Sequence, residues 1–337
     1  MNKVLVIQTA FIGDVVLMLP VVQSLRLNYP NLEIHVLVRK GNEELVQNRE
    51  DVNKVWIWDK KEGKLKNLIR LIRLFRKERY DKIINLHRFA STGIITVLSQ
   101  SKQTIGFDKN PLSAFFTVKV PHKIGKKGDS YFFHEVDRNL SLIQSFCSKL
   151  SRKPVLSLSP KHIQTAIQIL REYHVDKYIC AAPTSVWYTK QWHKDKWIGF
   201  FNLVPSQYTI FLLGSKEDYE YVQSIKESCR HDKVVNLAGK LSFLQSAALM
   251  KYATMVYVND SAPLHFASGV NAPTTAIFCS TIPEFGFAPL SEVHHVIEVK
   301  DLPCRPCGLH GRKACPLGHF NCAYLIDVQE VLRTLPN

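Results

Sequence analysis

Residues 4–16, VLVIQTAFIGDVV, decide the fold of this chain. An apolar, largely β-branched run stops at a polar turn that holds Gly13 and Asp14, and a run that predicts a helix follows. A second stretch of this kind, VYVNDSAPLH, occupies residues 256–265. Ligands bind at the carboxyl ends of the strands in open α/β sheets. Two such strand-to-helix turns therefore predict two α/β domains that face each other across a cleft.

The rest of the chain repeats this alternation in both halves. A length of 337 residues suits two domains, which we place at 1–155 and 156–337, with a linker at 153–160. The alternation predicts parallel, doubly wound sheets. We expect segment 106–133 to be irregular, as a mobile loop would be, and 134–150 to be helical. The expected strands are 3–8, 33–38, 54–58, 82–86, 178–182, 208–213, 234–237, 255–258 and 274–278, and the expected helices are 15–28, 62–79, 197–203, 217–229, 243–251, 264–269 and 327–334.

The charge is strongly basic and uneven. Lys and Arg number 44 against 29 Asp and Glu, and the first 150 residues hold 25 of these basic and 14 of these acidic residues. Such a field attracts nucleic acid, an anionic membrane or an anionic glycolipid, although a solvated basic surface explains it equally well. No apolar run reaches the ~18 residues of a membrane span, and residues 4–7 are too short for a signal-peptide core. These features predict a cytoplasmic protein.

Gly13 and Asp14 form the first candidate site. Glycine permits a tight turn and leaves backbone N–H groups open to a ligand. Asp14 is open to two interpretations, because a carboxylate at the start of a helix is also a favoured cap. The chain contains neither a Walker A pattern nor G-x-G-x-x-G, which argues against a P-loop ATPase and an NAD dehydrogenase.

Residues 13–20 (GDVVLMLP) and 259–265 (NDSAPLH) resemble the motifs of bacterial ADP-heptose:lipopolysaccharide heptosyltransferases, glycosyltransferase family 9. The resemblance extends over roughly residues 3–330. It implies the GT-B fold, with two Rossmann-like domains, and an inverting transfer of heptose from ADP-heptose, or a similar nucleotide sugar, to a lipopolysaccharide-core acceptor. It also implies that Asp14 is the general base, which takes the proton of the acceptor hydroxyl.

The segment 259–265 is the second candidate site. A helix N-terminus after a strand binds anions through free N–H groups and the helix dipole; alternatively, Asp260 and Ser261 only cap the helix and His265 belongs to the core. Relatives usually carry glycine where this chain has Ala262. The resemblance assigns the donor diphosphate and sugar to Asp260, Ser261, Ala262, Pro263 and His265.

Segment 184–192 (TSVWYTKQW) follows an expected strand and resembles the phosphate loop of the family. Lys190 would neutralise the leaving diphosphate, so no metal would be required; alternatively, it is a surface lysine between packing aromatic residues. Lys216 stands where some relatives carry glutamate. The remaining donor-binding residues that the resemblance implies are Gly13, Thr184, Ser185, Gly214, Ser215 and Leu241.

The acceptor side is predicted in the basic first half. A helical stripe could bind phosphates of the acceptor or simply be a solvated face, and a His-x-x-x-Arg pair shares one face of a later helix. The predicted acceptor-binding residues are Lys66, Arg70, Arg73, His87, Arg88, His134 and Arg138.

A cysteine cluster lies near the end of the chain, at Cys304, Cys307, Cys315 and Cys322. Four thiols in 19 residues can hold a structural zinc ion, but the second pair lacks CxxC spacing. Disulfides are disfavoured in a cytoplasm, so free or redox-labile thiols are the other interpretation.

Two functions of other classes stay open. Ala262 and Lys216 motivate a catalytically silent relative that only binds a nucleotide sugar. The charge motivates a nucleic-acid-binding protein, although no recognition motif supports it. The predicted partners are a nucleotide sugar, an anionic glycolipid and the peripheral surface of the inner membrane, and not nucleic acid.

Overall fold

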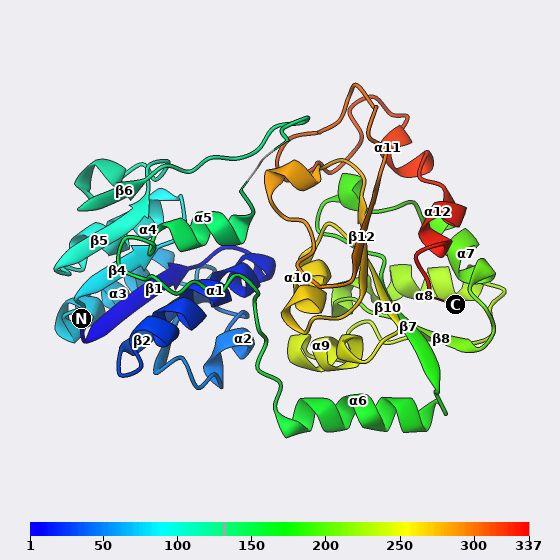
Figure 1. Cartoon of the computed structure of the whole chain (residues 1–337), viewed down its shortest axis with the longest axis horizontal. Helices are drawn as coiled ribbons and strands as arrows, with labels where there is room; N and C mark the ends of the chain where they lie inside the picture. Colours follow the sequence, from blue (N-terminus) through cyan, green and yellow to red (C-terminus); the bar gives the residue numbers. More distant parts are fainter. Residues whose placement is uncertain (131–132, 337) are drawn as a thin grey trace. The chain divides into compact units, whose positions relative to one another are not determined.

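The computed structural model describes residues 1–130 and 133–336. The chain divides into two compact units. The first unit comprises residues 1–124 and 133–157, and the second contains 125–130 and 158–336 of the described residues. Each unit is built around its own six-stranded sheet (Figure 1).

The first sheet is parallel, with the strand order β3-β2-β1-β4-β5-β6. Its strands are β1 (Lys3–Gln8), β2 (Glu33–Arg39), β3 (Lys54–Trp58), β4 (Lys82–Asn85), β5 (Gln103–Phe107) and β6 (Val118–Val120). The helices of this unit are α1 (Ile12–Asn28), α2 (Glu44–Gln47), α3 (Lys64–Glu78), α4 (Ala90–Leu98), α5 (Glu135–Ser141) and the 3-10 turn η1 (Ser113–Phe115).

The second sheet is also parallel, with the order β12-β11-β10-β7-β8-β9. Its strands are β7 (Lys177–Ala182), β8 (Tyr208–Leu212), β9 (Val234–Asn236), β10 (Met255–Asn259), β11 (Thr274–Phe278) and β12 (His294–Glu298). The α-helices are α6 (Pro160–Glu172), α7 (Lys194–Leu203), α8 (Tyr219–Ser228), α9 (Phe243–Lys251), α10 (Ala262–Gly269), α11 (Asn321–Tyr324) and α12 (Val328–Leu332).

The central strands β1, β4, β7 and β10 are buried over nearly their whole length and have apolar middles, as expected of strands in a parallel sheet with helices on both faces. In the first unit, Leu5 and Ile7 pack with Leu71 and Phe75 of α3 and with Ile95 of α4. In the second, aromatic side chains of α7 pack on alternate residues of β7, β8 and β10, and Val331 of α12 joins that core. Figure 1 shows α9 and α10 on one side of this sheet and α7, α8 and α12 on the other.

Each sheet has one switch point, where the strand order reverses direction along the chain. It lies between β1 and β4 in the first sheet and between β7 and β10 in the second. Ligands of open α/β sheets bind outside the carboxyl ends of the strands at this place. The predicted turns after β1 and β10 therefore lie where a ligand is expected.

Two local predictions were wrong. Segment 106–133 is not wholly irregular, because it contains the end of β5 and all of β6; residues 131 and 132 of it lie outside the described residues. The helix expected at 134–150 ends as α5 at Ser141. Beyond it, the Asn28 side chain accepts the N–H groups of Ser148 and Lys149, so a tertiary contact replaces helical hydrogen bonds there.

Within the described residues, no helix has the length and apolar character that a membrane span requires.

Candidate active site

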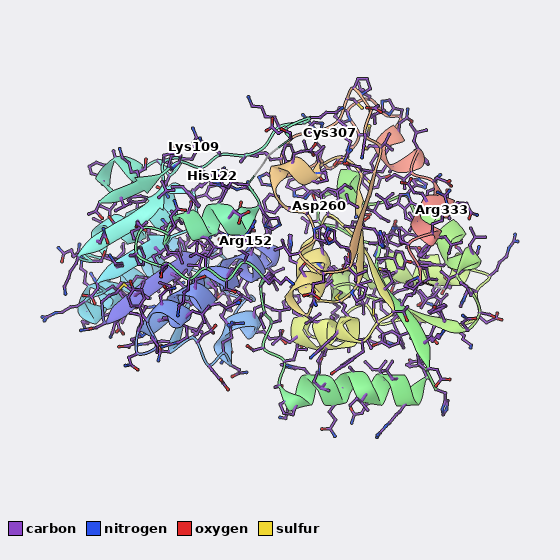
Figure 2. The ribbon with its side chains drawn as sticks, viewed as in Figure 1. Lys109, His122, Arg152, Asp260, Cys307 and Arg333 are labelled. Atoms are coloured by element: carbon purple, nitrogen blue, oxygen red, sulfur yellow. The ribbon has the colours of Figure 1, made fainter. Side chains whose placement is uncertain are left out.

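An ion pair spans the switch point of the second sheet. Lys190, in the loop after β7, places its Nζ atom 2.6 Å from Oδ2 of Asp260, which follows β10. The Thr281 hydroxyl donates to the same oxygen at 2.6 Å. Asp260 (labelled in Figure 2) is only 4% exposed. Two residues 70 positions apart thus meet at the edge where the fold predicts a ligand.

The environment keeps Asp260 ionised. Burial alone would raise the pKa of Asp260, but the Lys190 ammonium, the Thr281 hydroxyl and the charge of His265 lower it below its ordinary value. Lys190 and Asp260 therefore form a buried pair with no net charge. The pair holds the ammonium in place but offers an incoming phosphate less positive charge than an isolated lysine would.

Asn259, the last residue of β10, forms hydrogen bonds with the loop after β7. Its side chain is fully buried. It accepts the backbone N–H of Trp192 at 2.9 Å and donates to the carbonyl oxygen of Thr184 at 3.5 Å. Gln191 donates to the carbonyl of Ser185 at 2.8 Å. The predicted donor loop, with Thr184 and Ser185, is thus tied directly to the end of β10.

The N-terminus of α10 faces the same edge. Ser261 is its N-cap residue, yet no side-chain cap hydrogen bond is present, and Asp260 pairs with Lys190 instead of capping the helix. Neither side chain therefore caps α10 through a hydrogen bond, as the alternative interpretation of Asp260 and Ser261 predicted. Ala262 and Pro263 open the helix, and His265, 6% exposed, lies one turn on with its charge acting on Asp260.

The sequence did not predict that residues 304–322, the Cys-rich segment, contact Lys190 and its neighbour Thr189. The Arg312 N–H donates to the Thr189 hydroxyl at 2.7 Å, and the Thr189 N–H donates back to the Arg312 carbonyl at 3.1 Å. Gly311 lies so close that a Cβ atom there would stand 3.1 Å from Cγ of Lys190. The Cys-rich segment thus supports the lysine. The only sequence signal for this contact was Gly311 itself, which adopts a φ of 75°.

Two further predicted donor loops lie side by side. Gly214 accepts the N–H of Gly239 at 3.0 Å, and a Cβ on Gly239 would meet Cα of Lys216 at 2.7 Å. Asp218 accepts the N–H of Ser215 at 2.8 Å. The structure therefore brings Gly214 and Ser215, after β8, next to the turn before the half-buried Leu241, after β9.

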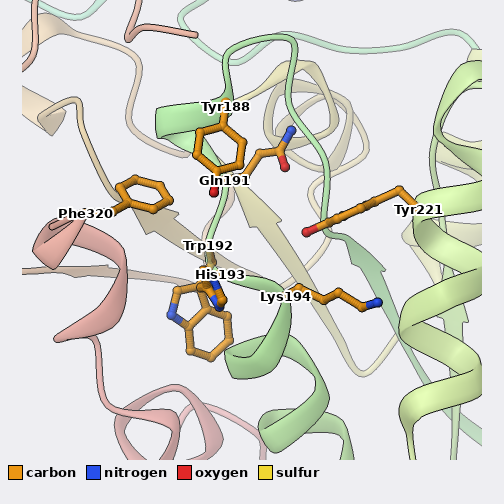
Figure 3. Close-up of a pocket in the computed structure, with 7 residues that line it drawn as sticks. All are labelled: Tyr188, Gln191, Trp192, His193, Lys194, Tyr221 and Phe320. Atoms are coloured by element: carbon orange, nitrogen blue, oxygen red, sulfur yellow. The ribbon is translucent and has the colours of Figure 1, made fainter. Parts of the chain in front are cut away.

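A small cavity adjoins the Lys190 loop on its aromatic side. Its volume is about 90 Å³, which is enough to hold water molecules. Tyr188 and Phe320 stack at 5.3 Å beside it, and Figure 3 shows how its side chains converge. The lining residues are Tyr188, Gln191, Trp192, His193, Lys194, Tyr221 and Phe320.

In the first unit, Asp14 lies in the first turn of α1. Its Oδ2 atom accepts the backbone N–H of Phe11 at 3.1 Å, so the carboxylate does cap the helix. It is half-buried. A carboxylate has two oxygens and about four acceptor positions, so this cap does not consume its capacity to accept a proton.

The switch point of the first sheet is built from Thr9, after β1, and His87, after β4. The Thr9 hydroxyl lies 3.3 Å from Nδ1 of His87. Lys60 donates to the carbonyl oxygen of Thr9 at 2.8 Å and to its hydroxyl at 3.0 Å. Burial, then the charges of Lys60 and Arg88, lower the pKa of His87 to about 3, so its imidazole is neutral. Lys60 was not predicted, because its half-burial beside Thr9 depends on tertiary structure.

The other predicted acceptor residues are dispersed. His134 is 7% exposed and its Nδ1 atom accepts the Val136 N–H, while Arg138, 3% exposed, pairs with Glu135 at 2.7 Å. Lys66, Arg70 and Arg73 lie on the exposed face of α3. The charges of Lys60 and Arg88 both act on His87, whereas His134 and Arg138 contact residues of their own helix, α5.

The four clustered cysteines are free thiols in the structure. Burial, then the nearby Cys307 and Cys315 thiols, raises the pKa of Cys322 to about 12. The Cys304 sulfur lies 3.9 Å from Nε2 of His319. The four cysteines are therefore neighbours, but no three of their sulfur atoms lie within 4.8 Å of one another. Among the described residues, the one group of three or more His, Cys, Asp or Glu side chains that meets this distance is Glu33, His35 and Glu78. There, Lys3 and Lys54 already hold the carboxylates.

Comparisons with known proteins agree with this architecture. The family model described as glycosyltransferase family 9 (heptosyltransferase) matches residues 68–317. The chain is 28% identical to lipopolysaccharide heptosyltransferase 3 of Escherichia coli over 281 residues, 80% of this chain and 82% of that protein. Its structure resembles E. coli ADP-heptose lps heptosyltransferase II with a TM-score of 0.79 at 20% identity, covering 99% of this chain and 97% of that one.

It also resembles E. coli heptosyltransferase WaaC with ADP, with a TM-score of 0.67 at 18% identity over 88% of this chain and 93% of that one. These likenesses identify the fold as GT-B, and the family model covers most of the chain. The chain belongs to glycosyltransferase family 9, the heptosyltransferases.

Proposed function

We propose that this protein transfers a heptose from ADP-heptose to a sugar of the lipopolysaccharide core, with inversion at the anomeric carbon. One observation supports the donor site above all: Lys190 and Asp260 meet across the switch point of the second sheet, beside an uncapped helix N-terminus. The donor is inferred from two solved relatives, one an ADP-heptose lps heptosyltransferase and the other a heptosyltransferase whose structure contains ADP.

Asp14 would act as the general base. The acceptor hydroxyl attacks C1 of the heptose and gives its proton to the Asp14 carboxylate, while the bond from C1 to the diphosphate breaks and ADP departs. The Phe11 N–H holds Oδ2 of Asp14 and so orients the carboxylate. A positioned base contributes roughly 10²–10⁴-fold to such a step.

Lys190 and the N-terminus of α10 would stabilise the departing diphosphate. An ammonium has three N–H donors, so Lys190 can bind a phosphate oxygen while it keeps its bond to Asp260. Asp260 would act as the positioning partner, because it fixes the ammonium at 2.6 Å. The added positive potential would come from the helix end, and the His265 ring would offer a hydrogen bond to a phosphate or sugar hydroxyl.

The remaining donor contacts would come from backbone-rich turns. We assign the diphosphate to Thr184, Ser185, Ser261, Ala262 and Pro263, and the nucleoside to the adjoining turns at Gly214, Ser215 and Leu241. Calorimetric titration with ADP, UDP, GDP and CMP without metal tests this assignment. We expect selective ADP binding that is weakened in Lys190→Ala; equal affinity for all four nucleotides would contradict it.

The acceptor would bind the first unit while the protein rests on the cytoplasmic face of the membrane. On α3, Leu65 is 68% and Ile69 42% exposed, and Lys66, Arg70 and Arg73 surround them. Exposed apolar residues within a basic helical face are typical of binding to an anionic membrane surface. In a flotation experiment, vesicles that contain anionic lipid should carry the wild-type protein to the top of the gradient but not the Leu65→Asp/Ile69→Asp variant. Equal flotation of the wild type with neutral vesicles would contradict binding to an anionic membrane.

We also propose that the transfer needs no metal and that zinc binding draws the four cysteines together, because no three of their sulfur atoms lie within 4.8 Å of one another in the structure. Four reduced thiols suit zinc, and the segment that they occupy supports Thr189 and Lys190. Elemental analysis should find about one zinc per chain, which is lost in Cys304→Ser/Cys307→Ser. A protein without zinc that binds ADP normally would contradict the zinc proposal alone.

A further inference from the structure

The turn after β11 makes contact on both sides of the donor-site ion pair. The Thr281 hydroxyl donates to Oδ2 of Asp260 at 2.6 Å. The Ser280 hydroxyl accepts the hydroxyl of Thr189, the residue before Lys190, at 3.0 Å. Ser280 is 0% and Thr281 1% exposed, and β11 pairs with β10, which Asp260 follows. A displacement of this turn would therefore move the aspartate and, with it, the bound ammonium.

Arg305, in the Cys-rich segment, binds this turn. Its guanidinium donates to the backbone carbonyl oxygen of Thr281 and to that of Val299, the latter at 2.9 Å. It also pairs with the Glu298 carboxylate at 2.6 Å. Glu298 is the last residue of β12, which pairs with β11. The guanidinium thus joins the end of one strand to the turn that follows the neighbouring strand.

Stability is a weak explanation for an arginine at this position. The side chains of Arg305 and Glu298 are 2% and 13% exposed, and exchange of a buried ion pair for well-packed apolar residues is often neutral or stabilising. An arginine contributes direction, because its planar guanidinium presents several N–H donors in a fixed fork. Here the fork bridges two carbonyl oxygens and one carboxylate, and these three bonds define the position of the turn.

We propose that Arg305 and Thr281 are positioning residues for the departure of the diphosphate. Arg305 fixes the turn after β11. From this turn, the Thr281 hydroxyl fixes the Asp260 carboxylate, which orients the Lys190 ammonium. The inference rests on the proposed glycosyl transfer, in which Lys190 is the cation that meets the diphosphate. Both positioning residues act through Asp260 and not through a contact with the substrate.

Two substitutions at Thr281 test the role of its hydroxyl. Thr281→Val removes it at similar volume and should lower kcat roughly 10–100-fold, because misplacement of a reacting group by about 1 Å costs up to about 10²-fold. The negative charge on the diphosphate grows as its bond to C1 breaks, so the KM for the donor should rise less than about threefold. Thr281→Ser should keep most of kcat. Equal losses of kcat in the two variants, or wild-type kcat in Thr281→Val, would overturn the proposal.

A matched control removes another buried hydroxyl of the same strand and loop region. Thr275, in β11, is 0% exposed, and its hydroxyl donates to the Thr334 hydroxyl at 2.7 Å. Thr275→Val should lower the melting temperature by a similar amount to Thr281→Val but leave kcat unchanged. A loss of kcat as large as that of Thr281→Val would attribute both effects to general destabilisation and would overturn the proposal.

A double-mutant cycle tests whether Arg305 acts through the Thr281 hydroxyl. Arg305→Lys keeps a charge beside Glu298 but lacks the planar fork, and it should lower the wild-type kcat roughly tenfold. In the Thr281→Val background, the same substitution should lower kcat less than about twofold, because coupled residues are not additive. Equal factors in the two backgrounds would show independent action and would overturn the role assigned to Arg305.

A measurement on the resting protein does not depend on turnover. The NMR signal of the Cε methylene group of Lys190, assigned with Lys190→Arg, should shift in Thr281→Val and in Arg305→Lys. It should stay in place in Thr275→Val. An unchanged Lys190 signal in the first two variants would refute the positioning role. Absence of heptose transfer by the wild type would refute the proposed function instead, and the Lys190 signal would still decide the positioning role.

Discussion

Lys190 and Asp260 form a buried ion pair, 2.6 Å long, across the switch point of the second sheet. The contact joins the loop after β7 to the end of β10, and Thr281 adds a third element from beyond β11. It also explains why an acidic residue stands where an anionic donor is expected. Asp260 positions the ammonium, and the donor would share the lysine instead of finding it free.

The first prediction concerns this pair. In Lys190→Met the Asp260 carboxylate would stay buried without its cation, and breaking a buried pair destabilises a protein by about 3–5 kcal/mol. For a unit of this size that lowers the melting temperature by roughly 6–20 °C. Differential scanning calorimetry of the full chain measures it.

The double variant Lys190→Met/Asp260→Asn is the control, because it removes both charges. It should recover most of the lost melting temperature while remaining inactive. A double variant as unstable as Lys190→Met would show that packing of the lysine chain, and not its charge, supports the fold.

A second prediction tests the contact of the Cys-rich segment with Lys190. Gly311 and Gly308 both adopt a positive φ, 75° and 81°, so alanine strains the backbone similarly at either place. A methyl group on Gly311 would press on Lys190 and Thr189, whereas nothing lies within 4 Å of one on Gly308. Gly311→Ala should therefore weaken ADP binding about tenfold, and Gly308→Ala should not.

Calorimetric titration of the two variants decides the outcome. Equal ADP affinities, with equal melting temperatures, would mean that the Cys-rich segment does not position the lysine.

The third prediction separates capping from catalysis at Asp14. Asp14 is the third residue of α1 and accepts the backbone N–H of the N-cap residue Phe11. The Oδ1 atom of an asparagine can accept the same N–H, so Asp14→Asn should keep its ADP affinity and lose at most about 1 kcal/mol of helix-dipole stabilisation, but lose roughly 10²–10⁴-fold in kcat. Asp14→Ala should lose the same activity and, in addition, the hydrogen bond to the Phe11 N–H, which is about 1 kcal/mol of stability. Substantial turnover by Asp14→Asn would exclude the carboxylate as the base.

Much of the fold could be predicted from the sequence, because β1 and β10 are buried on both faces and are therefore continuous apolar runs. The elements that escaped prediction carry weaker patterns. β6 is a three-residue edge strand, and β12 begins with two exposed histidines. No helix was predicted at α6, although Ser159 before Pro160 is a recognisable helix start; only Pro160 lay within the predicted linker.

The site divides in the same way. Residues within one turn, such as Ser261 and His265, could be predicted together because they share a local motif. The partnership of Lys190 with Asp260 and the position of Lys60 could not, because each depends on which strands are neighbours in the sheet. The Arg312–Thr189 contact joins residues 123 positions apart, which no local pattern encodes.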